Sequence, residues 1–221
     1  MDRRRCEKVS VEDVGICGVR PMKSINWKNA LRIITGITGI VFVVNLVANN
    51  MAVSFSLVWN SISLSVTIIT VLAILFCQVL WKFKCFQKWL VLIPNLNGVW
   101  KGAIHTDFID PFTYEEIKKI DAELTIKQSL FHISCRMKTN NMTSHSVSAN
   151  FLLDDDNQKC QLLYTYLSTP KQTVQYVSRI HYGTVLYDMN DHYEVDALEG
   201  NYWTGRETVG TITLVKTSDN P

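Results

Sequence analysis

The sequence predicts a membrane-anchored all-β protein, in which two N-terminal transmembrane α-helices are followed by a small eight-stranded antiparallel up-and-down β-barrel. Three observations support this prediction. Residues 33–81 form a stretch of 49 residues without any Asp, Glu, Lys or Arg. After Pro94, short runs of alternating apolar and polar residues follow one another, separated by turn residues. Basic residues flank the uncharged stretch, whereas residues 92–221 contain 11 basic and 16 acidic side chains.

The uncharged stretch is long enough for two membrane spans. A charged side chain at the bilayer centre costs at least about 2.5–3.5 kcal/mol, and one span needs about 20 residues. Asparagines and serines interrupt the apolar runs between residues 49 and 60. We therefore expect helices near 30–49 and 60–81, joined by a turn. A cleaved signal peptide is disfavoured because the apolar core starts late and a second span follows it directly.

The positions of the basic residues predict the orientation. Seven lysines and arginines lie before the first span, and Lys82, Lys84 and Lys88 follow the second span. Because positive residues stay on the cytoplasmic side, both chain ends are expected there. The chain then divides into a basic cytoplasmic segment (1–29), a two-helix transmembrane hairpin with its junction (30–92) and a cytoplasmic β-barrel (93–221).

Polar residues within the spans are candidate contacts between helices. Asn45 lies in the first span, and Ser61 and Ser65 lie four residues apart in the second. Small residues let helices approach closely, and a buried asparagine requires a hydrogen-bond partner. Two interpretations stay open: these side chains pack the two helices of one hairpin, or they form a contact between copies of the chain.

The soluble part contains eight predicted strands, bounded by turn sequences such as Asp154–Asn157 and Met189–Asp191. Residues 114–120 are expected to form one helical turn in the first connection. Eight short antiparallel strands are typical of an up-and-down barrel, which has no free edge and has room for side chains or one small ligand. The strands are predicted at 97–106, 121–128, 130–138, 143–153, 159–167, 179–188, 192–203 and 208–216.

Strand order predicts which residues share the barrel end that lies away from the membrane. Odd strands should end, and even strands begin, at this distal rim. Arginine side chains suit phosphates and aromatic faces suit bases, so the rim is the candidate ligand site. The alternative is that the tyrosines fill the core and the arginines pair with acidic neighbours. The candidate ligand-binding residues are Arg136, Tyr164, Tyr166, Arg179, Tyr182, Tyr202, Thr204 and Arg206, with Lys138 and Trp203 nearby.

No catalytic or metal-binding motif is present. The sequence lacks GxSxG, HExxH, P-loop and GxGxxG patterns, and its five histidines show no ligand spacing. The six cysteines form no CxxC pair, which favours scattered reduced thiols over a zinc site. The net acidic barrel is unsuited to binding DNA or RNA polymers. We therefore expect no enzyme activity and no metal.

Three segments point to a known family. Residues 94–102 read PNLNGVWKG, residues 198–206 read LEGNYWTGR and residues 210–216 read GTITLVK. Together with the two spans, they resemble the two-transmembrane, β-strand-rich effectors of CBASS, the bacterial antiphage systems that signal with cyclic oligonucleotides. Gly98 and Trp100 also resemble the GxW opening of lipocalin and avidin barrels, where the tryptophan plugs the closed end.

The resemblance implies a mechanism. A partner nucleotidyltransferase makes a cyclic dinucleotide, which is the activating ligand of the barrel and the only cofactor-like molecule expected. Binding triggers self-association, and the helices disrupt the bacterial inner membrane, in which the chain is a multi-pass protein with a cytoplasmic N-terminus and barrel. The infected cell then dies. Two alternatives remain: a membrane-tethered barrel that binds an apolar molecule or lipid, and a non-enzymatic interaction module of an envelope complex.

Overall fold

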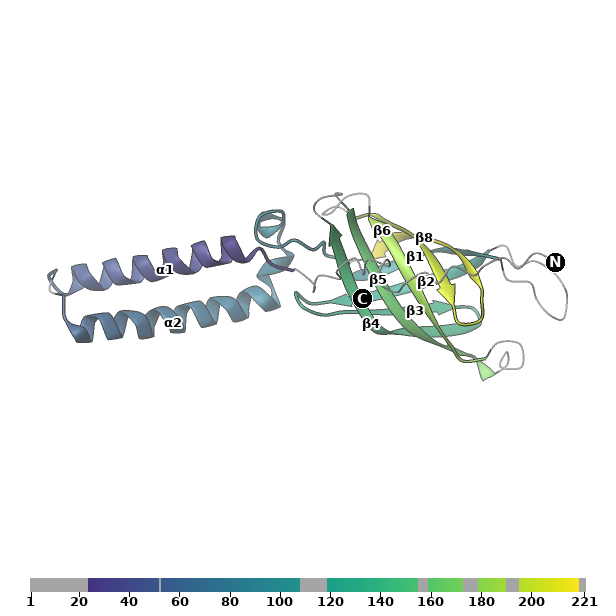
Figure 1. Ribbon diagram of the computed structural model, residues 1–221, viewed down its shortest axis with the longest axis horizontal. Helices are drawn as coiled ribbons and strands as arrows, with labels where there is room; N and C mark the ends of the chain where they lie inside the picture. The colour runs from purple at the N-terminus through teal and green to yellow at the C-terminus, as the bar shows by residue number, and fades with distance from the viewer. Residues whose placement is uncertain are drawn as a thin grey trace, which may run out of the picture.

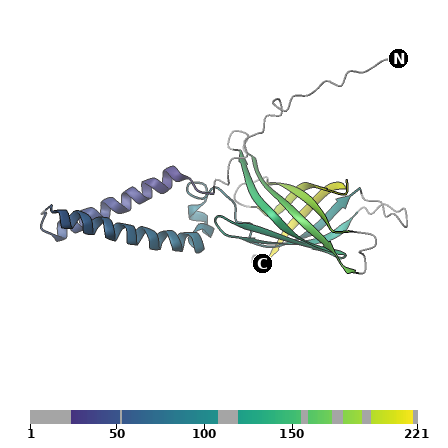
Figure 2. The ribbon, with the colours of Figure 1, turned by 60° about the horizontal axis from the view of Figure 1, so that its bottom comes forward.

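The computed structural model has two parts, a helical hairpin and a β-barrel, arranged end to end along the long axis (Figure 1). The hairpin projects from one end of the barrel, and a turned view shows the same arrangement (Figure 2). The structure describes residues 24–51, 53–107, 119–154, 159–172, 179–189 and 195–218. We call the barrel end next to the helices the base and the opposite end the distal mouth.

The hairpin consists of α1 (Trp27–Ala48) and α2 (Phe55–Gln78). Both are long and apolar enough to cross a membrane, as predicted. The boundaries differ from the prediction. α2 begins before residue 60 because the Ser54 side chain caps it, accepting a hydrogen bond of 3.2 Å from the Leu57 amide. It ends before Trp81, which lies in a short 3₁₀ turn.

The buried face of α2 consists of Leu57, Ser61 and Ser65, spaced at four-residue intervals. Residues at this spacing share one helix face, and α1 is the element that runs alongside it (Figure 1). The Ser65 hydroxyl donates a hydrogen bond of 2.7 Å to the Ser61 carbonyl. Asn45 of α1 is half-buried. In this single chain, the two serines thus lie on the face of α2 that packs against α1.

The junction ties the beginning and the end of the hairpin together. The Asn26 amide donates to the Leu90 carbonyl at 2.8 Å, and the Leu92 amide donates to the Ser24 carbonyl at 3.0 Å. Between α2 and this pairing, the 3₁₀ turns Leu80–Lys82 and Lys84–Phe86 reverse the chain. The segment before α1 therefore pairs with the segment that enters the barrel.

The barrel is closed, with each strand antiparallel to its neighbours in sequence order and β8 paired to β1. This confirms the predicted fold class. The strands are β1 (Gly98–Thr106), β2 (Ile120–Gln128), β3 (Ile133–Thr139), β4 (Met142–Asp154), β5 (Lys159–Pro170), β6 (His181–Met189), β7 (Ala197–Thr204) and β8 (Val209–Ser218).

Most strands start and end within a few residues of the prediction, and the differences have local causes. β3 starts at Ile133 instead of 130 because Ser129–His132 forms a tight turn, in which the Ser129 amide donates to the His132 carbonyl at 2.7 Å. β7 starts at Ala197 instead of 192; residues 190–194 lie outside the described residues. The helical turn expected at 114–120 also falls outside them, except for its last two residues, and Ile120 already belongs to β2.

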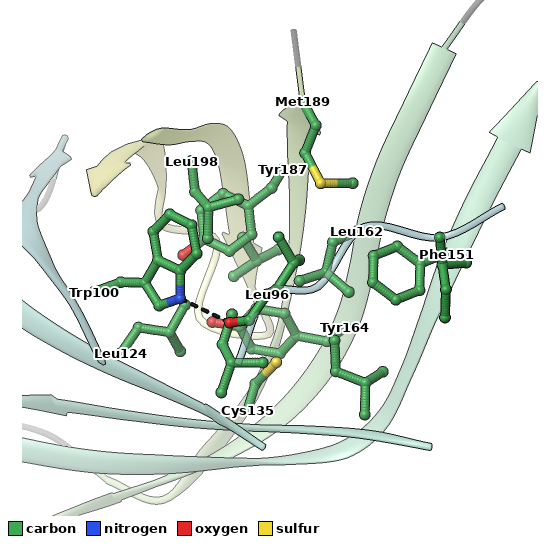
Figure 3. Close-up of a cluster of buried hydrophobic side chains, with 14 of the residues drawn as sticks. Leu96, Trp100, Leu124, Cys135, Phe151, Leu162, Tyr164, Tyr187, Met189 and Leu198 are labelled. Carbon is green, nitrogen blue, oxygen red and sulfur yellow. Dashed lines mark hydrogen bonds between the residues drawn. The ribbon is translucent and has the colours of Figure 1, made fainter. Parts of the chain in front are cut away.

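One hydrophobic core runs from the barrel interior through the base into the junction (Figure 3). Trp100 is fully buried, and its indole Nε1 donates to the Leu96 carbonyl at 3.0 Å. Leu96 and Ile93 of the entering segment are equally buried, and so is Trp81 of the junction. The base is thus filled by the chain that connects the helices to β1.

Gln128 at the end of β2 satisfies the backbone of this entering segment. Its Oε1 accepts from the Leu96 amide, and its Nε2 donates to the Pro94 carbonyl, both at 2.8 Å. Its own amide donates to Asn97 Oδ1 at 2.7 Å. Gly98 follows with φ 133°, a conformation that side chains disfavour. Buried backbone groups need such partners, so Gln128 fixes where the chain enters the barrel.

We expect Gln128→Met to destabilise the full-length protein. Methionine keeps the volume but leaves the buried Leu96 amide and Pro94 carbonyl without partners, at about 1–3 kcal/mol for each group. Thermal unfolding in detergent micelles should shift down by several degrees. The matched control is Gln161→Met, because Gln161 bonds to Asp188 on the exposed outer wall. Equal melting temperatures for the two variants would contradict this role for Gln128.

Candidate ligand-binding site

The distal mouth is where odd strands end and even strands begin, because β1 starts beside the junction and the strands alternate in direction. This confirms the strand polarity that the sequence predicted. Side chains along each strand alternate between the interior and the outer wall, so only half of the rim residues can face the interior.

A column of tyrosines rises through the interior towards this mouth. Tyr164 and Tyr187 are fully buried in the middle of the barrel, with ring centroids 6.1 Å apart (Figure 3). Tyr166, two residues further along β5, has its ring centroid 5.9 Å from that of Tyr164. Burial raises the pKa of both Tyr164 and Tyr187 well above the ordinary range. These hydroxyls therefore stay neutral, and the column is uncharged.

Glycines on neighbouring strands hold two tyrosine rings against the barrel wall. Tyr166 pairs in register with Gly183, and Tyr202 pairs with Gly210. A Cβ atom at Gly183 would lie 2.4 Å from Tyr166 Cζ, and one at Gly210 would lie 2.7 Å from Tyr202 Cε1. Any larger residue would push the ring out of its place. The glycines thus fix the positions of Tyr166 and Tyr202 at the mouth.

The turn between β7 and β8 brings Arg206 to the same place. Its backbone amide donates to the Thr204 hydroxyl at 3.2 Å, and the Thr204 and Thr208 hydroxyls are 2.7 Å apart. The Gly205 amide donates to the Tyr182 carbonyl at 2.9 Å, which ties the turn to β6. These contacts fix the backbone of the turn that carries the arginine at the rim.

Arg206 and two tyrosines influence one another's pKa, which indicates that the three side chains are neighbours. Partial burial lowers the pKa of Arg206, and the neighbouring Tyr166 and Tyr202 raise it. Burial raises the pKa of Tyr166 to about 12, further raised by Tyr202 and lowered by Arg206. Burial also raises the pKa of Tyr202. At neutral pH the mouth therefore contains one charged guanidinium near two neutral, buried phenols.

His181, the first residue of β6, belongs to the same group. Its Nδ1 lies 2.9 Å from the Arg179 carbonyl. Burial lowers the pKa of the imidazole below its ordinary value; the contact with that carbonyl raises it, and Arg206 lowers it. The ring is therefore neutral at pH 7. Sequence reasoning missed His181, although its position at the start of an even strand marks it as a rim residue.

The structure brings together half of the eight candidate residues. Tyr166, Tyr202, Thr204 and Arg206 gather at the mouth, and Tyr164 lies deeper in the column. The remaining three point elsewhere.

Arg136 is exposed on the outer wall, because it alternates with the buried Cys135 and Met137. Tyr182 is 61% exposed on the outside, and Arg179 is an exposed residue that precedes β6. Lys138 and Trp203 are also exposed. The expected convergence of three arginines is thus reduced to one. The alternation around Arg136 was readable in the sequence and would have excluded it from the interior.

The described residues near this group form no metal site. In the part of the chain that the structure describes, no three His, Cys, Asp or Glu side chains lie close enough to hold a metal ion. The donors at the mouth are a guanidinium, phenols, hydroxyls and an imidazole. Such a set suits a phosphate-bearing or base-bearing organic ligand.

The fold defines a class of protein, a closed β-barrel carried on two helices of membrane-spanning length. Comparison with known proteins makes the class specific. Residues 91–216 match the family model of the Cap15 cyclic dinucleotide receptor domain, and the chain belongs to this family. CD-NTase-associated protein 15 of Staphylococcus schleiferi is 29% identical over 157 residues, which cover 70% of this chain and 78% of that protein. The resemblance to CBASS effectors is thereby confirmed.

Proposed function

We propose that the distal mouth binds a cyclic dinucleotide, with Arg206 on a phosphate and the faces of Tyr166 and Tyr202 against the bases. The observation that carries this proposal is the charged Arg206 beside two neutral tyrosines, in a chain of the cyclic dinucleotide receptor family. A charge-assisted hydrogen bond is stronger than a neutral one, and aromatic faces stack on any base. The polar mouth argues against a purely apolar ligand.

The membrane step extends this proposal. Residues 1–29 and 93–221 are cytoplasmic, and residues 30–92 span the inner membrane of a bacterium. A nucleotidyltransferase supplies the messenger; ligand-bound barrels associate, and their helices disrupt the bilayer. A ligand shifts an equilibrium only if it binds one state better, so the associated form must bind the dinucleotide more tightly. Confinement to a membrane raises the effective concentration of the helices, so weak helix contacts suffice.

We expect Arg206→Gln to remove most of the stabilisation that a cyclic dinucleotide gives to the full-length protein. The loss of one charge-assisted hydrogen bond costs about 1.5–3 kcal/mol, which is about 10- to 100-fold in affinity. A thermal-shift panel of cyclic di-GMP, cyclic di-AMP and cyclic GMP–AMP measures this. Arg136→Gln is the matched control, because it removes the same charge from the outer wall. Equal ligand-induced shifts in the two variants would disprove the assigned site.

The same two variants test the membrane step in liposomes that contain an entrapped dye. The dinucleotide that stabilises the wild-type protein most should release the dye from wild-type and Arg136→Gln vesicles. At the same dinucleotide concentration, vesicles that contain Arg206→Gln should retain the dye, because this variant binds too little dinucleotide. Tight binding by the wild-type protein without dye release would refute the disruption mechanism and leave the binding site standing.

The affinity for the dinucleotide should increase as the pH falls from about 7.5 to about 5.5. A phosphate near His181 favours the imidazolium, so binding takes up a proton and is strengthened at low pH.

The stability of the free protein should show the opposite trend. The folded-state pKa of His181 is lowered, so unfolding takes up a proton and the free energy of unfolding falls below about pH 6.5. His181→Gln should flatten both trends. A pH-independent dissociation constant in the wild-type protein would remove His181 from the site.

A further inference from the structure

The base of the barrel carries exposed aromatic side chains that the proposed ligand site does not use. Phe131 lies in the turn between β2 and β3 and is 57% exposed. Phe83 and Trp89 of the junction are 52% and 43% exposed. We call these three side chains the basal aromatic group. They come from two segments far apart in sequence.

These segments lie on the same side of the molecule. Both views show the β2–β3 turn next to the end of α2 (Figures 1 and 2). The contacts agree with this, because Gln128, just before the turn, bonds to Pro94 and Leu96 of the segment that leaves the junction. The basal aromatic group is therefore carried by segments that meet where the chain passes from the helices to the barrel.

The exposure of Phe131 is built into the turn. The adjacent Leu130 is 1% exposed and packs in the core that also contains Trp81. The Ser129 amide donates to the His132 carbonyl at 2.7 Å, and the His132 amide donates to the Ser129 hydroxyl at 3.1 Å. Because the neighbouring Leu130 side chain points into the core, the Phe131 side chain is held outward, away from the core.

Lysines accompany the aromatic side chains. Lys82, Lys84 and Lys88 follow α2, and Lys127 comes directly before Gln128 at the end of β2. All four are exposed, although the barrel part of the chain is net acidic. Aromatic residues at headgroup depth and lysines at the phosphates are the typical residues of a membrane–water interface.

We propose that the base of the barrel is a second membrane contact, in which Phe131, Phe83 and Trp89 enter the headgroup layer of an anionic bilayer while Lys82 and Lys127 lie at its phosphates. The proposal rests on the two helices crossing that bilayer, since they bring the base to its surface. It adds a function to the β2–β3 turn: the contact fixes the tilt of the barrel and turns the distal mouth away from the lipid. Each exposed phenylalanine that leaves water contributes favourably.

Hydrogen–deuterium exchange of the full-length protein tests this contact, with one chain per nanodisc and no dinucleotide. In nanodiscs containing phosphatidylglycerol, peptides that cover residues 127–133 should exchange about tenfold more slowly than in detergent micelles, the order expected for an aromatic turn that leaves water. Phe131→Ser should abolish this slowing. The matched control is Val147→Ser, which removes a similarly exposed apolar side chain from the barrel wall and should keep the slowing.

Two internal references make the result decisive. Peptides over residues 139–142, in the β3–β4 turn at the distal end, should exchange equally in all samples, which shows that the variants are folded. Peptides over residues 61–72 of α2 should stay protected, which shows that the helices are embedded. If α2 is protected while residues 127–133 exchange as fast in nanodiscs as in micelles, or remain slowed in Phe131→Ser, the basal contact is refuted and the membrane anchor is not.

Discussion

The packing at the base of the barrel is the constraint on which the rest of the structure depends. A closed barrel has two ends. In this protein, the segment that connects the helices to β1 fills one of them. Leu96 and Ile93 enter the core, Trp100 closes over them, and Gln128 supplies the hydrogen bonds that the buried backbone would otherwise lack. Because the helices and the barrel share a core, the base is unavailable for a ligand. Among the described residues, this leaves the distal mouth as the candidate site, at the end of the barrel opposite the helices.

The net charge of the barrel does not favour binding of an anionic ligand at the proposed site. Residues 92–221 carry more acidic than basic side chains, so long-range attraction does not steer an anionic ligand towards it. At the proposed site, recognition would therefore depend on short-range contacts. Arg206 is held in place by its own turn, and Tyr166 and Tyr202 are held by the glycines opposite them. A site that is organised before the ligand arrives loses little side-chain entropy on binding, which compensates for the missing attraction.

Sequence patterns predicted the elements well and the site only in part, for a physical reason. The absence of charge over residues 33–81 and the period-two alternation are averages over many residues, so a single exception does not change the prediction. A binding residue depends on the direction of one side chain. Arg136 was placed at the correct end of β3, but its neighbours Cys135 and Met137 face the core, so it must face outward. Arg206 lies in a turn, where alternation does not apply, and its position depends on hydroxyl contacts that no pattern reveals.

The closed barrel also limits how a signal can pass from the mouth to the helices. Every strand is hydrogen-bonded to two neighbours, so the wall has no free edge that can open like a hinge. A change at Tyr166 meets Tyr164 and Tyr187, which are fully buried, and then the packed base around Trp100. Close-packed interiors of this kind do not deform continuously, so they rearrange only where a second stable packing exists. This rigidity favours the proposed association of copies of the chain, through the outer surface around the mouth, over a rearrangement within one copy. In such a scheme, the rigid base makes the helices follow the barrels when the barrels associate.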